Sequence, residues 1–138
     1  MTLDPERALT GAIFAHLCTD PAITAVLGEP PRVYDAPPLD PVFPYVTLGR
    51  SQARLWGGVD GEGTEHVLTL TVASRFIGME EVRQIGGLVR AVLDDTPLTL
   101  TDHRLVSLRV TYTDVFRATN WRTIFAALRL RAVTEPLT

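Results

Sequence analysis

The sequence predicts an α+β fold: an antiparallel sheet of about four main strands with helices packed on one face. Three observations support this prediction. Apolar residues recur at helical spacing near the N-terminus and again between Gly78 and Pro97. Apolar and polar residues alternate with a period of two in the remaining segments. A proline-rich and a glycine-rich stretch separate these regions.

Two short helices are predicted first. Asp4-Pro5-Glu6 combines an N-cap acid with a proline at the first helical position, which predicts a helix over 5–18. Asp20-Pro21 repeats this signal and predicts a helix over 21–27, ended by Gly28.

Residues 29–44 contain six prolines and therefore form neither a helix nor a central strand. An extended surface segment with a short strand at 32–34 is expected instead. An interdomain linker is the competing interpretation, but about 28 residues precede the segment, too few for a domain. The chain is therefore expected to form a single domain over 1–138.

Strands follow on both sides of a glycine-rich loop. Val46 and Leu48 alternate with polar neighbours, and alternation resumes at Leu68 after residues 57–64, which predicts a long hairpin loop. In the helix that follows, Gly86-Gly87 costs helix stability, and close packing on the sheet would explain it.

The last third of the chain shows the clearest strand pattern. Two strands of about ten residues are predicted around a turn at 118–120. One face is apolar and the other is rich in Thr and Arg, which predicts a sheet covered on one side only. The apolar set is Val106, Leu108, Val110, Tyr112, Ile124, Ala126, Leu128 and Leu130.

Composition excludes several classes of protein. The chain has 138 residues, a net charge of −3 and one cysteine. Its length is enough to bury a hydrophobic core, but it lacks the excess of basic residues that nonspecific binding to duplex DNA requires. An internal disulfide and a multi-cysteine zinc site are excluded, and no apolar run is long enough for a membrane span. The N-terminus lacks the pattern of a secretion signal, so a cytoplasmic protein is expected.

No catalytic, cofactor or metal site is predicted, and the chain is not expected to be an enzyme. The three histidines lack metal-ligand spacing: His16 is expected half-buried, and His66 and His103 are expected to be exposed at strand starts. Cys18 has no base beside it, and the glycine-rich loop neither opens a helix nor matches calcium-loop spacing.

The surface offers a better candidate, because aromatic residues and arginines together are typical of protein–protein interfaces. All 13 basic residues are arginines, which a GC-rich coding sequence or interface contacts would explain. Two interpretations compete with an interface: the two tryptophans could lie at the edge of the core, and the arginines could be ordinary solvated surface residues. The candidate interface residues are Arg54, Trp56, Gly57, Gly58, Asp60, Arg109, Arg117, Trp121, Arg129 and Arg131.

A succession of modest motifs over roughly residues 5–133 resembles the tail-terminator, or tail-completion, proteins of phages, prophages and phage-like gene transfer agents. The motifs are DPAITAVLG (20–28), RVYDAPP (32–38), PYVTLG (44–49), HVLTLTVASR (66–75) and LTLTDHRLVSLR (98–109).

The resemblance implies a structural virion protein without catalytic residues or cofactors. It implies a homo-oligomer, a hexameric ring that caps the tail tube and joins it to the head-side connector or neck protein. The protein is therefore expected to assemble in the cytoplasm, to end in the virion and to make no contact with a membrane. Arg54, Trp56 and loop 57–64 are expected to contact the tail tube or a neighbouring subunit. Arg109, Arg129 and Arg131 are expected to pair with acids of the next subunit or to face DNA in the channel.

Two alternatives stay open at this stage. A head-completion or neck adaptor protein between portal and tail would share the size and composition. A monomeric cytoplasmic module that binds a small ligand would instead require an apolar pocket between helix and sheet.

Overall fold

The computed structural model describes residues 2–57, 62–75 and 78–137 and confirms the α+β class. The sheet has five strands, not about four, because a two-residue strand adds to the four long ones. Its order is β1-β2-β3-β5-β4; β1 runs parallel to β2 and the other pairs are antiparallel. The elements are α1 (Pro5–Thr19), α2 (Pro21–Leu27), β1 (Val33–Tyr34), β2 (Tyr45–Trp56), β3 (Gly63–Ser74), α3 (Glu80–Leu93), β4 (His103–Arg117) and β5 (Ile124–Pro136).

The helix starts follow the predicted signals. The carboxylates of Asp4 and Asp20 each accept hydrogen bonds from two backbone N–H groups in the first turns of α1 and α2. These bonds satisfy donors that a helix cannot pair internally. Helix α3 begins at Glu80 without a side-chain cap, and it ends at Leu93, before Pro97.

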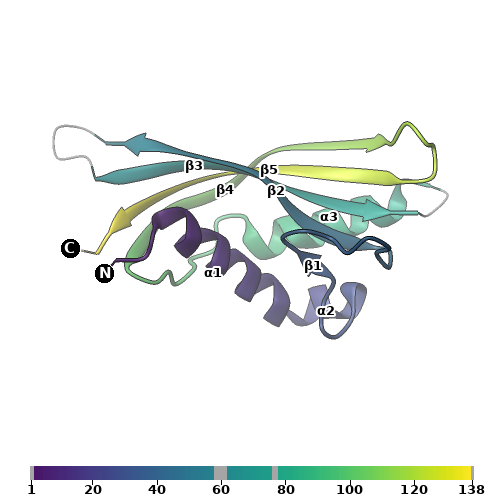
Figure 1. Cartoon of the computed structure of the whole chain (residues 1–138), viewed down its shortest axis with the longest axis horizontal. Coiled ribbons are helices and arrows are strands. Elements are labelled where there is room, and N and C mark those ends of the chain that lie inside the picture. Colours follow the sequence, from purple (N-terminus) through teal and green to yellow (C-terminus); the bar gives the residue numbers. More distant parts are fainter. Residues whose placement is uncertain (1, 58–61, 76–77, 138) are drawn as a thin grey trace.

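All three helices lie on one face of the sheet, as Figure 1 shows. The core between them is aliphatic, and its largest fully buried side chains are Leu9, Ile13, Leu17, Ile23, Leu27, Leu68, Leu70, Ile85, Leu93, Leu108, Ile124 and Leu128. Gly86 faces β5: a Cβ added there would lie 3.6 Å from the Cβ of Ala126, so this glycine is part of the close packing. A Cβ added at Gly87 would meet no atom of another described element within 4 Å, so packing explains only the first glycine of the pair.

Two irregularities in β4 change which residues face the core. The register shifts between Leu105 and Ser107 and again between Val110 and Tyr112. A bulge inserts an extra residue and reverses the alternation beyond it. Tyr112 and Val106 were predicted on the apolar face, and this was wrong: they are 52% and 51% exposed.

The expected exposure of two histidines was also wrong. His66 and His103 are buried, and their Nε2 atoms lie 2.9 Å from Thr134 Oγ1 and 2.7 Å from the Leu3 carbonyl oxygen. His16 is half-buried, as predicted, with Nε2 3.1 Å from the Val92 carbonyl oxygen.

Within the described residues, no single helix is long and apolar enough to cross a membrane. The pair α1 and α2, bent by 76°, passes the same test of length and composition only when taken together.

Candidate functional site

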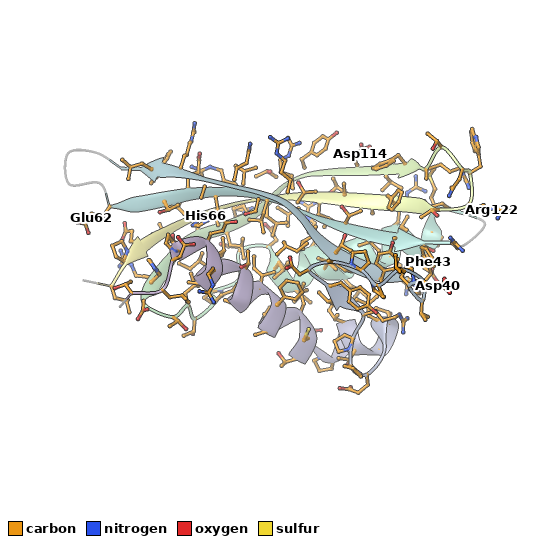
Figure 2. The ribbon with its side chains drawn as sticks, viewed as in Figure 1. Asp40, Phe43, Glu62, His66, Asp114 and Arg122 are labelled. Atoms are coloured by element: carbon orange, nitrogen blue, oxygen red, sulfur yellow. The ribbon has the colours of Figure 1, made fainter. Side chains whose placement is uncertain are left out.

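The candidate site is the face of the sheet that the helices leave uncovered, called here the open face. Strand register places rows of side chains across it, because residues directly opposite in paired strands point to the same face. One row joins Arg54, Glu65, Val133 and Ser107, and the next joins Gln52, Val67, Arg131 and Arg109. Figure 2 shows Asp114 on the side of the sheet that faces away from the helices.

An acid–arginine cluster occupies the β2–β3 end of the open face. Glu65 is only 7% exposed and accepts hydrogen bonds from Arg131 Nε at 2.8 Å and from Arg54 Nε at 2.5 Å. The Arg131 guanidinium also lies 4.9 Å from the ring centroid of Trp56. The hydrogen bonds from Arg131 and Arg54 lower the pKa of Glu65. The cluster therefore holds a tryptophan and two guanidinium groups in fixed positions at the surface.

Two more arginines stand on the open face nearer to β4. Arg109 Nε donates to Asp94 at 3.1 Å, and the backbone N–H of Val110 donates to the same carboxylate at 2.8 Å. The Val110 bond is the main reason that the pKa of Asp94 is lowered, and Arg109 adds to it. The Arg129 guanidinium lies 5.2 Å from the ring centroid of Tyr112.

The remaining predicted residues lie elsewhere. Arg117 and Trp121 are at the β4–β5 turn, at the opposite end of the sheet from the β2–β3 turn, with the guanidinium 6.0 Å from the indole centroid. Gly57 follows β2 with φ 127°, a conformation that favours glycine. Gly58 and Asp60 fall outside the described residues.

The structure therefore brings Arg54, Trp56, Arg109, Arg129 and Arg131 together on one face. The two tryptophans are not core edges, because Trp56 is 42% and Trp121 is 75% exposed.

Sequence reasoning missed three contributors to this face: Glu65, Tyr112 and Asp114. Glu65 lies two residues before Val67 in the polar phase of β3, and this alternation could have revealed it. Tyr112 and Asp114 follow the second register shift of β4, which no pattern of residues in the sequence predicts.

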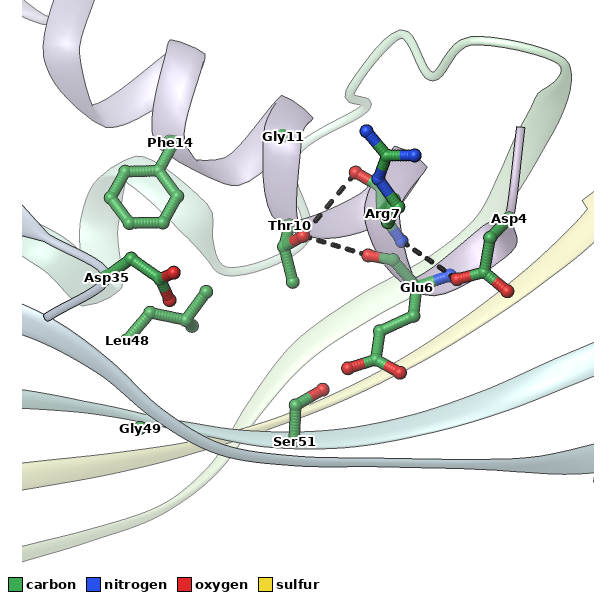
Figure 3. Close-up of a pocket in the computed structure, with 10 residues that line it drawn as sticks. All are labelled: Asp4, Glu6, Arg7, Thr10, Gly11, Phe14, Asp35, Leu48, Gly49 and Ser51. Atoms are coloured by element: carbon green, nitrogen blue, oxygen red, sulfur yellow. Dashed lines mark hydrogen bonds between the residues drawn. The ribbon is translucent and has the colours of Figure 1, made fainter.

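A second concave region lies between α1 and β2 (Figure 3). This cleft has a volume of about 540 Å³. Phe14 and Leu48 give it an apolar part, but carboxylates of Asp4, Glu6 and Asp35 also line it. It therefore differs from the apolar pocket that a small-ligand module requires. Within the described residues, no group of three or more His, Cys, Asp or Glu side chains could hold a metal ion.

Comparison with known proteins matches this chain to a protein family and to solved structures. The family described as tail completion protein gp17 matches residues 11–135. Among solved structures, a chain from the virion of a native gene transfer agent (GTA) particle is similar, with a TM-score of 0.86 and 27% sequence identity. That match covers 94% of this chain and 96% of the other. No curated protein matches the sequence significantly.

Proposed function

This chain belongs to the tail completion protein gp17 family, and from this membership we propose that it is a tail terminator, a ring-forming protein that ends the tail tube. The expected resemblance to tail-completion proteins is thereby confirmed, and the protein is a phage tail structural protein. The finer proposal is that copies form a hexameric ring that caps the tube and meets the head-side connector. It assigns the chain no catalytic role and no cofactor.

The observation that carries the ring proposal is the open face of the sheet. Four strands of 12 to 15 residues present one whole face that no helix of the described part of the chain covers. A sheet face of this size with ordered arginines and aromatic side chains is suited to a partner protein or to the wall of a channel. In the proposal, Arg54, Trp56 and the 57–64 turn contact the tail tube protein or the next subunit.

Arg109, Arg129 and Arg131 are assigned to the inner side of the ring, towards passing DNA. Arg109 and Arg131 each make an ion pair with an acid of the same chain. Because those acids neutralise part of the positive charge, the wall would attract DNA only weakly. A conduit requires this, since strong phosphate contacts would hold the DNA in place.

Electron microscopy of particles from the producing strain tests the proposal, with the gene deleted and with the gene restored as control. A tail terminator predicts overlong or ragged tubes without heads in the deletion strain and normal particles after restoration. Tails of normal length beside filled or leaking heads would assign the chain to the head side of the neck. Normal particles in the deletion strain would refute a virion role.

A further inference from the structure

The two outer edges of the sheet each carry a stretch to which no strand is bonded among the described residues. On β2, the short strand β1 pairs only with Val46 and Thr47, so the outer edge from Ser51 to Trp56 has no partner strand. On β4, the edge up to Val110 is covered by the segment after α3: Asp95 N–H donates to the Leu108 carbonyl at 2.8 Å. Among the described residues, no strand is bonded to the edge of β4 from residue 111 to 116.

The free backbone groups on these edges can be identified. In an antiparallel ladder, alternate residues direct their N–H and C=O groups to opposite sides of the strand. On β2, Val46 N–H points outward to the Arg32 carbonyl, and the residues in the same phase further along are Ser51, Ala53 and Leu55. On β4, Val110 N–H points outward to Asp94, and the same phase beyond the bulge gives Thr113 and Val115.

Exposed apolar side chains concentrate on the same two edges. Leu55 is 80% exposed on β2, beside Trp56, and Tyr112 and Phe116 are exposed on β4. Long edges with unpaired backbone groups and exposed apolar side chains readily pair with another strand. The two stretches are also of equal length, six residues each.

We propose that, in the ring on which the proposed function rests, residues 112–116 of one copy pair antiparallel with residues 52–56 of the next copy. The direction is fixed by the sheet itself. Three antiparallel steps separate β2 from β4, so these strands run in opposite directions and a second copy in the same orientation continues the alternation. Such a head-to-tail contact uses two different surfaces and can repeat around a ring.

One register gives complementary side chains on the open face. With Ala53 opposite Val115 of the next copy, Arg54 stands opposite Asp114, and Trp56 stands opposite Tyr112. Arg54 uses its Nε for Glu65 and keeps its two terminal nitrogens for a further acid. Cross-strand pairs of opposite charge and of aromatic rings both stabilise sheets.

The displacement between copies fits a closed wall of strands. Arg54 lies directly opposite Glu65 on β3. Asp114 lies opposite Ala127 on β5, which in turn lies opposite Thr71 on β3, six residues beyond Glu65. Six residues correspond to a shift of about 20 Å, over a width of roughly 19 Å for four strands. The resulting strand tilt is about 45°, at the upper end of the range found in closed barrels.

Disulfide formation between copies tests the pairing. Gln52→Cys and Phe116→Cys, in a Cys18→Ala background, stand at directly opposite positions in the proposed ladder, at a Cα separation of about 4.5 Å that a disulfide can bridge. Mild oxidation of purified particles and of concentrated purified chain is expected to give a ladder of covalent multimers. The control pairs Gln52→Cys with Ser107→Cys, on the same strand and face as residue 116 but beside the covered edge, and is expected to give none.

Each outcome decides between the two proposals. Multimers in particles support both. Particles that contain the chain with its cysteines unlinked overturn the edge pairing and leave the tail terminator proposal standing. Multimers of purified chain, with the chain absent from particles, support the pairing and refute the virion role. No multimers and no chain in particles refute both.

A second variant tests the pairing without cysteines. Ala53→Pro removes an outward N–H that takes no part in the β2–β3 ladder, so the fold is expected to survive, as circular dichroism would show. Assembly is expected to be lost in this variant and kept in Ala53→Val. Assembly of folded Ala53→Pro at the wild-type level would overturn the pairing.

Discussion

Acidification is expected to destabilise the protein through one buried histidine. His66 is 0% exposed, its Nε2 lies 2.9 Å from Thr134 Oγ1, and its Nδ1 has no partner among the described residues. Burial is the main cause that lowers the pKa of His66 and nearby His103 adds to it, while Glu6 and Asp4 partly oppose the shift. The native state therefore holds this ring neutral, and the unfolded state takes up a proton near pH 6.5.

The sign and the size of the effect follow from linkage. Because the unfolded chain binds the extra proton, stability is complete above about pH 6.5 and falls as the pH drops below it. If the ring stays neutral in the native state, the loss at pH 5.5 is about 1.4 kcal/mol. Glu65 and Asp94, whose pKa values are lowered from already acidic values, lose their contribution only at lower pH.

Urea unfolding at pH 7.5 and at pH 5.5 measures this loss. The variant His66→Gln keeps an amide able to bond Thr134 but cannot titrate, so it is expected to lose about 1.4 kcal/mol less than the wild type. The control His16→Gln retains His66 and is expected to keep the wild-type loss. An equal loss in wild type and His66→Gln would refute the reasoning.

Three further predictions concern stability and are measured by urea or thermal unfolding. Gly87→Ala is expected to raise the free energy of unfolding by about 1 kcal/mol, since the position is exposed and open. Gly86→Ala is expected to raise it by less, because the added methyl group meets β5. An equal increase in both variants would contradict the packing given for Gly86. Leu128→Ala is expected to cost about 3 kcal/mol, because the side chain is fully buried under α3, and a cost below about 1 kcal/mol would argue against that core. Asp20→Ala removes the cap of α2 and is expected to cost about 1 kcal/mol, with Asp40→Ala, in the exposed proline-rich segment, as a neutral control.

Local signals in the sequence predicted much of the fold. Asp-Pro pairs predicted the starts of both N-terminal helices, because an aspartate cap and the fixed φ angle of proline act within a few residues. Uninterrupted alternation placed β5 correctly, with Ala126, Leu128 and Leu130 on the core side. The arginines of the open face followed from the same alternation.

The errors arise where structure depends on distant partners. The bulges of β4 are set by its pairing with β5, so Tyr112 was assigned to the wrong face. His66 is polar and close to a turn, which suggested exposure, but Thr134, 68 residues away, gives it a buried hydrogen bond. Glu65 is held by Arg131 from β5, and the sequence does not show that β5 lies beside β3.

The order of strands has a consequence for synthesis of the protein. β5 is the last strand in chain order, yet it lies between β3 and β4 and pairs with both. Until residues 124–136 have left the ribosome, β4 lacks the strand it pairs with, β3 pairs on one side only, and the core cannot close. Pairing over such sequence distances is slow, so the sheet is expected to close only after β5 has emerged and to expose apolar surface in the interval. A nascent chain is therefore not expected to enter an assembling tail before β5 has left the ribosome.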